Sequence, residues 1–150
     1  MRTEGNKQTV NVDTDHRIIK DSEFNLSKDV LWDIILRSGA GEVNLDLQDL
    51  QVASVDIDCG ASEIDGTLSD KAKKVNIEIN TGASDIEFKI PKGSACEVIS
   101  SSAATSIKID NTTLSGIGKK TYRTENFDTA SVVFYFNISS GASDIKISYY

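Results

Sequence analysis

The sequence is poor in the residues that build most metal centres and redox sites. Its 150 residues include a single histidine, His16, and two cysteines, Cys59 and Cys96. One histidine cannot supply a multi-histidine metal site, so we interpret His16, which lies beside Asp13 and Asp15, as a solvated surface residue. No apolar run approaches the roughly 18 residues that cross a bilayer as a helix. The sequence therefore predicts a soluble domain.

The charge distribution argues against nucleic acid as a partner. The chain has 23 acidic and 16 basic residues and a net charge of −7, and no basic stripe is present. Nucleic-acid-binding domains concentrate lysine and arginine on one face. The hydrophobic fraction of 39% and the charged fraction of 26% are typical of a single globular domain.

A short glycine-alanine block recurs along the chain. Its five copies are Ser38–Val43, Cys59–Ile64, Thr81–Ile86, Ser102–Ile107 and Ser140–Ile145. The glycine column, which holds Gly39, Gly60, Gly82, Ala103 and Gly141, repeats after 21, 22, 21 and 38 residues. A period of this length is the signature of a stacked repeat architecture.

Apolar residues alternate on both sides of the glycine column. The columns are Ile34, Val55, Ile77, Val98 and Phe136 before it, and Val43, Ile64, Ile86, Ile107 and Ile145 after it. Alternation indicates strands with one buried face. The inward positions shift by one residue across the glycine, which predicts a corner there, and glycine suits a corner because it tolerates backbone angles closed to other residues.

The residue after the glycine is alanine in all five copies, at Ala40, Ala61, Ala83, Ala104 and Ala142. We interpret this column as a closed corner with room for a methyl group only. Ala83 is then expected to pack between Ala61 and Ala104. The predicted structural corner consists of Gly39, Gly60, Gly82, Ala83 and Gly141.

These patterns predict an all-β fold, a parallel β-solenoid of about five rungs. A β-sandwich of antiparallel hairpins is the structural alternative. Residues 1–29 lack the block and are expected to form an N-terminal extension and cap, and residues 30–150 to form the solenoid. An insertion near 111–131 is interpreted as an extra strand pair or a covering loop, with a binding surface as the alternative.

Two groups of residues resemble catalytic elements and are better explained structurally. Cys59 and Cys96 fall in inward columns two rungs apart, too far for a disulfide, so buried free thiols are expected. Ser62, Ser84 and Ser143 follow Gly-Ala. A hydrolase elbow needs G-x-S-x-G with a partner base, so we interpret these serines as corner residues that bond to nearby backbone.

Outward-facing acidic residues form columns across the expected rungs. Glu42, Glu63 and Asp85 make one column, and Asp65 and Glu87 make a second. Like charges on neighbouring strands repel by roughly 0.2–1 kcal/mol each, so the columns either splay into water or hold a cation. The glycine-rich nonapeptides of calcium-binding β-rolls are absent. We favour a solvated acidic face and predict no metal site and no cofactor.

The repeated G-A-S-[DE]-I block, the step Ile90-Pro91-Lys92-Gly93 and the stretch from Tyr122 to Ala130 resemble the C-terminal domain of LiaF-type proteins. These cell-wall-active antibiotic response proteins are related to the toast-rack and "putative adhesin" domains of bacteria. The resemblance covers roughly Val30 to Tyr150 and departs from the pattern at Ala103. It implies a right-handed parallel β-solenoid that is not an enzyme and is often tethered to a membrane. It also implies a link to envelope-stress sensing or adhesion.

We therefore expect a non-enzymatic interaction module of a bacterial cell-envelope-associated protein, bound to a protein partner or to a second copy. A surface adhesin or carbohydrate-binding domain is the alternative, and a hydrolase would need paired acid and base groups in a cleft. The expected contact surfaces are the insertion and the last rung, Val132–Tyr150, which would expose an uncovered edge. The candidate contact residues are Tyr122, Tyr135, Tyr149 and Tyr150.

Overall fold

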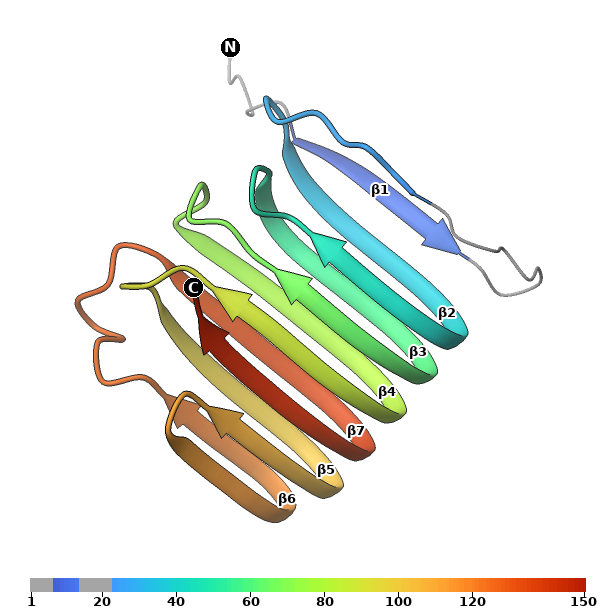
Figure 1. Cartoon of the computed structure of the whole chain (residues 1–150), viewed down its shortest axis with the longest axis vertical. Coiled ribbons are helices and arrows are strands. Elements are labelled where there is room, and N and C mark those ends of the chain that lie inside the picture. Colours follow the sequence, from blue (N-terminus) through green and yellow to red (C-terminus); the bar gives the residue numbers. More distant parts are fainter. Residues whose placement is uncertain (1–6, 14–22) are drawn as a thin grey trace.

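The computed structural model describes residues 7–13 and 23–150, and these contain seven β-strands in one sheet. The strands are β1 (Lys7–Asp13), β2 (Leu31–Asp46), β3 (Gln51–Thr67), β4 (Lys74–Ile90), β5 (Ala95–Ile109), β6 (Thr112–Arg123) and β7 (Val133–Tyr149). Their order in the sheet is β1-β2-β3-β4-β7-β5-β6 (Figure 1). Asp13 ends β1, whereas Asp15 and His16 lie outside the described residues.

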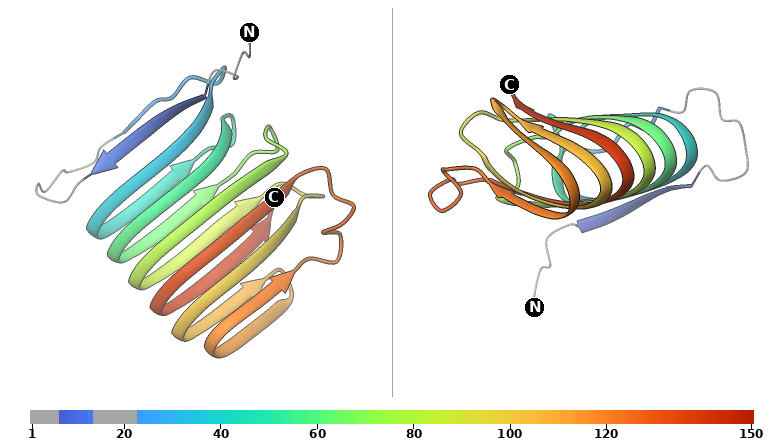
Figure 2. Two further views of the ribbon diagram at one scale, coloured as in Figure 1. Left: turned by 180° about the vertical axis from the view of Figure 1, so that it is seen from behind. Right: turned by 90° about the horizontal axis from the view of Figure 1, so that it is seen from below.

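Each long strand bends near its middle, so the single sheet folds back on itself as two layers (Figure 2). In the strands that run parallel to one another, the first layer holds the residues before the bend and the second layer holds those after it, whereas β6 runs in the opposite direction. Strands β1, β2, β3, β4, β7 and β5 pair in parallel with their neighbours. This pairing confirms the predicted all-β solenoid.

The strand register follows the repeat. Ala40, Ala61, Ala83, Ala142 and Ala104 are partners on successive strands. One irregularity lies between Trp32 and Asp33, where the register of β2 and β3 shifts by one residue. As a result Val52 is buried and Ala53 is only half-buried.

The core fills the space between the two layers. It is built from isoleucine and valine columns, with the phenylalanines concentrated on β4 and β7. Phe88, Phe134 and Phe136 are at most 1% exposed, and the rings of Phe88 and Phe136 lie 5.4 Å apart. Burial of one such side chain contributes roughly 1.5–3 kcal/mol, so these columns dominate the stability of the stack.

The strand order corrects the expectation that rungs stack in sequence order. β7 lies between β4 and β5, and Phe136 therefore pairs with Ile77 on one side and Val98 on the other. The β7 copy has apolar residues in the same inward columns as every other copy. Its hydrophobic pattern is therefore compatible with any of the other strands as a neighbour. The last rung is consequently not an uncovered edge, and that expectation is wrong.

The insertion forms β6, which is the edge strand of the sheet, and a loop that crosses β5. β6 pairs antiparallel with β5, which departs from the otherwise parallel order. The loop 124–132 then returns to β7. The amide of Thr124 donates to Cys96 O, the amide of Cys96 donates to Thr124 Oγ1, both at 3.0 Å, and Asn126 Nδ2 donates to Ser94 O at 3.1 Å. These bonds hold the loop against the start of β5.

The N-terminal strand β1 covers only the first layer of β2. Lys7 Nζ lies 2.8 Å from an Asp33 carboxylate oxygen, and the Trp32 indole donates to Ser27 O at 2.8 Å. The extent of the cap, residues 1–29, remains a prediction. Nowhere in residues 7–13 and 23–150 is there a helix of the length and apolar character that a bilayer crossing requires.

Candidate interaction surface

Three of the four corner glycines, Gly60, Gly82 and Gly141, are explained by close backbone approach between neighbouring rungs, whereas a Cβ on Gly39 would meet nothing within 4 Å. A Cβ placed on Gly82 would lie 2.7 Å from Gly60 O, and one placed on Gly141 would lie 2.6 Å from Gly82 O. None of the corner glycines has a positive φ. The expected reason, unusual backbone angles, is therefore wrong, and at Gly60, Gly82 and Gly141 the carbonyl of the adjacent strand excludes a side chain. At the corner of the fourth copy, Ala103 coincides with an irregular register between β5 and β6.

The alanine column faces solvent, which corrects the expectation of a closed corner. Ala83 is exposed and pairs with Ala61 and Ala142, not with Ala104. The inward position is taken by the next residue, which is Ser62, Ser84, Ser143 or Thr105 and is buried in each case. The phase shift at the corner thus places two successive residues, glycine and alanine, on the outside.

We expect Ala83→Leu to change the free energy of unfolding by no more than about 0.5 kcal/mol, because the side chain points into solvent. Ser84→Leu, one residue further and 6% exposed, should overpack the inner corner and cost about 1–3 kcal/mol. Urea denaturation of both variants measures the difference. A loss above 1 kcal/mol for Ala83→Leu alone would restore the closed corner.

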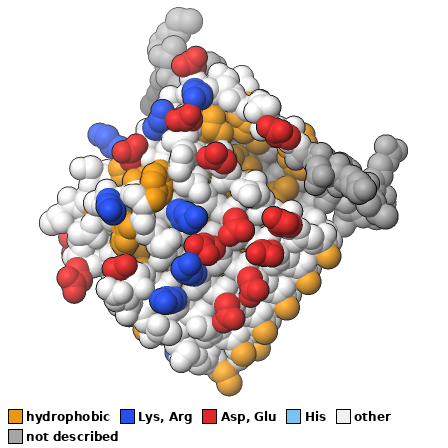
Figure 3. All heavy atoms as spheres, in the orientation of Figure 1, with side chains coloured by type: hydrophobic (Ala, Val, Ile, Leu, Met, Phe, Trp, Pro, Cys, Tyr) orange, Lys and Arg blue, Asp and Glu red, His pale blue; other side chains and the backbone are white. Residues whose placement is uncertain are grey.

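An apolar row with acidic neighbours runs along the bend, and we call it the corner surface. Its residues are Ala40, Ala61, Ala83, Ala142, Ala104 and Ile117, with Glu42, Glu63, Asp85 and Asp144 beside them. Ile117 on β6 is 82% exposed. Figure 3 shows hydrophobic side chains in a row along the edge where the strands bend, with acidic groups next to them. A shallow open groove of about 700 Å³ runs beside this row.

The strand register aligns the acidic residues in a column, as the sequence indicates, and adds a fourth residue to that column. Glu42, Glu63 and Asp85 are partners on β2, β3 and β4, and Asp144 on β7 continues the column. None of these four carboxylates forms an ion pair with another described residue. In the neighbouring column Lys146 Nζ lies 3.0 Å from a Glu87 carboxylate oxygen. No group of three or more potential metal ligands occurs in the described part of the chain.

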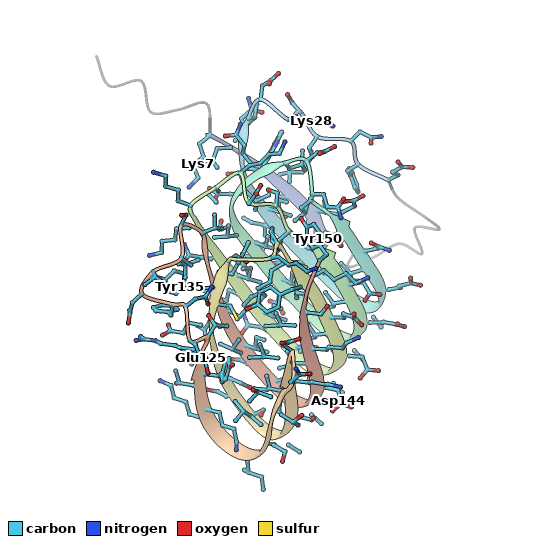
Figure 4. All side chains as sticks on the ribbon, turned by 60° about the vertical axis from the view of Figure 1, so that its left-hand side comes forward. Lys7, Lys28, Glu125, Tyr135, Asp144 and Tyr150 are labelled. Carbon is cyan, nitrogen blue, oxygen red and sulfur yellow. The ribbon has the colours of Figure 1, made fainter. Side chains whose placement is uncertain are left out.

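Tyr135 lies on the outer face of the first layer, on the opposite side of the molecule from Asp144 (Figure 4). Lys74 Nζ lies 4.7 Å from its ring centroid, and the Phe127 ring packs edge-on at 5.9 Å. The Arg123 guanidinium lies over Phe127 and pairs with Glu97. The chain's own side chains therefore contact Tyr135, which leaves it half-buried.

The other candidate tyrosines lie away from Tyr135. Tyr122 is half-buried on β6. Tyr149 is half-buried at the end of β7, where burial, and to a smaller extent Cys96, Tyr122 and Asp110, raises its pKa to about 12. Tyr150 is 43% exposed, and its hydroxyl donates to Leu68 O at 2.6 Å. The four tyrosines thus form no common patch, and their role as contact residues remains a prediction.

The cysteines and corner serines occupy structural positions. Cys59 and Cys96 are free and buried, and β4 and β7 separate their strands, one more strand than expected. Three strand spacings amount to about 14 Å, well beyond disulfide range. Burial raises the pKa of Cys96 to about 12, which disfavours the reactive thiolate. Ser84 Oγ accepts a hydrogen bond from the Ser62 amide at 3.1 Å inside the corner.

Ile117 is the exposed residue that the sequence interpretation missed. It stands between Gly116 and Gly118 in a stretch of polar residues. An isolated large apolar residue flanked by glycines does not fit the alternating pattern of a buried column, and that signal marks Ile117 as a surface feature. The glycines have φ values of +132° and +93°, so the bend of β6 depends on residues that tolerate this backbone region.

Comparison with known proteins gives two matches. A protein-family model described as the N-terminal domain of toast_rack, DUF2154, matches residues 1–89. A solved structure titled "putative cell adhesion protein" from Clostridium sporogenes ATCC 15579 is similar in fold, with a TM-score of 0.66 and 19% sequence identity. The alignment covers 88% of this chain and 67% of that chain. No curated protein matches the sequence.

Proposed function

This chain belongs to the toast-rack family, and from that premise we propose that it is a non-enzymatic interaction module of a bacterial cell-envelope-associated protein. The proposal includes a protein partner and a link to envelope-stress sensing. The observation that supports it best is the corner surface. It presents a continuous row of methyl groups and an 82% exposed Ile117 to solvent.

Exposed apolar rows of this kind favour contact with another molecule. The alanines are small, so a partner backbone can approach closely over Ala83 and Ala142. The acidic row beside them selects against anionic partners and favours a partner segment that carries lysine or arginine. Because these carboxylates have no basic partner among the described residues, a cationic segment would displace no existing ion pair.

The test is capture of a partner from a membrane fraction of the source bacterium by the immobilised chain. Ile117→Glu and Ala142→Glu should abolish capture, because each places a charge in the apolar row. Asn137→Glu is the matched control, since Asn137 is exposed on the same strand as Ala142 but faces outward from the first layer. Higher salt should weaken capture, as expected for acidic contacts.

Equal capture by all three variants would contradict the corner surface as the contact site. Failure of the unsubstituted chain to capture any protein would contradict the interaction module itself. Thermal unfolding of each variant, monitored by circular dichroism, separates loss of binding from loss of fold.

A surface adhesin or carbohydrate-binding domain is the second candidate. It is favoured by the fold similarity to the protein titled "putative cell adhesion protein". The discriminating measurement is binding to purified bacterial cell-wall polysaccharide that has been freed of protein. Retention on this material, with no protein captured from the membrane fraction, would favour the adhesin over the protein-binding module.

A further inference from the structure

The position of β7 leaves a strand-wide slot in the rest of the fold. The chain leaves β4 at Ile90 and enters β5 at Ala95, yet these two strands are not neighbours. With adjacent strands about 4.8 Å apart, β4 and β5 lie nearly 10 Å apart. The gap is filled by the last strand of the chain, which reaches it only after β6 is complete.

β7 fits this slot along its entire length. It pairs in parallel with β4 from Lys74–Val133 to Ile90–Tyr149, and with β5 from Ala95–Val133 to Ile109–Ile147. Its inward side chains Phe134, Phe136, Ile138, Ile145 and Ile147 are at most 2% exposed. Without β7, two strand edges and the centre of the core would face water, so the slot strongly favours occupation by this particular strand.

Among the described residues, a single connection joins β7 to the other strands. The loop 124–132 is held on β5 by Thr124 and Asn126, whereas Asp128, Thr129 and Ser131 are exposed. Beyond β7, the Tyr150 amide donates to Ile90 O and the Lys92 amide donates to Tyr150 O, both at 3.1 Å. Every one of these slot contacts would be identical if β7 came from another molecule of the same sequence.

We propose that the slot between β4 and β5 also accepts β7 of a second copy of this chain, which gives a dimer that exchanges β7. Each half of this dimer keeps all the strand pairs of the monomer, and only the loop 124–132 changes its path.

The short tether gives a chain's own β7 an effective concentration in the millimolar range. The monomer therefore dominates at micromolar concentration, and exchange requires refolding from a concentrated solution. This inference goes beyond the proposed function, since it requires no envelope partner.

The test uses two variants of this chain whose introduced thiols become neighbours when β7 is exchanged. Glu78 on β4 and Asn137 on β7 are exposed partners in the register, and neighbouring strands lie within disulfide range. A Glu78→Cys chain and an Asn137→Cys chain are unfolded together under reducing conditions, refolded at millimolar concentration and then oxidised. The buried Cys59 and Cys96 remain unreactive. We expect a covalent dimer on a non-reducing gel.

The control keeps the Glu78→Cys chain and changes only the variant with which it is mixed. Asp56 on β3 is the register partner of Glu78 on its other side, and β3 is not exchanged, so Glu78→Cys mixed with Asp56→Cys should give no covalent dimer. Asp85→Cys mixed with Asp144→Cys probes the second layer and should behave like the first mixture. One chain carrying both Glu78→Cys and Asn137→Cys should close its own bond in the monomer.

No covalent dimer from either β4–β7 mixture would overturn the proposal. A dimer of equal yield from the Asp56→Cys control would also overturn it, because the link would then reflect random collision or edge pairing. Neither result would affect the interaction module, whose test uses the monomer and the corner surface.

Discussion

Phe136→Ala should lower the free energy of unfolding by about 3–5 kcal/mol, the range for removal of a buried phenylalanine side chain. Phe136 is 1% exposed, its ring lies 5.4 Å from that of Phe88, and it pairs with Ile77 and Val98 on two different strands. The resulting cavity opens at the centre of the stack. Urea denaturation followed by circular dichroism gives the loss directly.

Asn137→Ala is the control for this measurement, because the adjacent side chain is exposed on the same strand. It should change the free energy of unfolding by no more than about 0.5 kcal/mol. A Phe136→Ala loss as small as that of the control would be inconsistent with β7 inside the sheet. It would instead fit a last rung docked loosely at one end.

Gly82→Ala should destabilise the fold by about 1–3 kcal/mol, as overpacking of a tight site does. Its Cβ would lie 2.7 Å from Gly60 O, a backbone atom of the neighbouring strand that cannot move without disturbing the pairing of β3 and β4. The same urea measurement applies. Here the physical cause of the expected destabilisation is contact between two rungs.

Gly39→Ala separates this cause from backbone flexibility. Gly39 has the same place in the repeat and the same following alanine, but a Cβ there meets nothing within 4 Å. Its substitution should therefore be nearly neutral. Equal losses at Gly39 and Gly82 would indicate that glycine is needed for its conformational freedom at every corner.

The repeat predicts the strand register almost residue by residue. The acidic columns illustrate this, because Glu42, Glu63 and Asp85 are indeed aligned on adjacent strands. Register follows from sequence here because a slip of one residue would move every apolar side chain to the wrong face. The same reasoning predicts the inward columns and the position of the corner.

Strand order could not be predicted in the same way. Val98 and Phe136 occupy the same column, so hydrophobic pattern alone does not tell whether β4 is followed by β5 or by β7. The long interval between the fourth and fifth copies was the relevant signal, since it provides enough chain to form β6 and return across β5. The extra neighbour of Asp85, Asp144, follows from this order and was missed with it.

The orientation of the corner is ambiguous in the sequence for a simpler reason. Alternation breaks at the bend, and a pattern with two successive outward residues looks the same as one with two inward residues. Only the small size of Ala83 was available to decide, and small residues suit both a closed corner and an open ridge. The candidate site therefore lies at the alanines and Ile117 of the bend, whereas the sequence indicates tyrosines at an expected edge.

The position of β7 in the sheet has a consequence for biosynthesis. A ribosome that adds about 5–20 residues per second completes β2, β3, β4, β5 and β6 before any part of β7 has been made. During that interval the nascent chain carries two open strand edges, on β4 and β5, and an uncovered set of isoleucines. Folding of this domain is therefore expected to finish only after its last strand has left the exit tunnel.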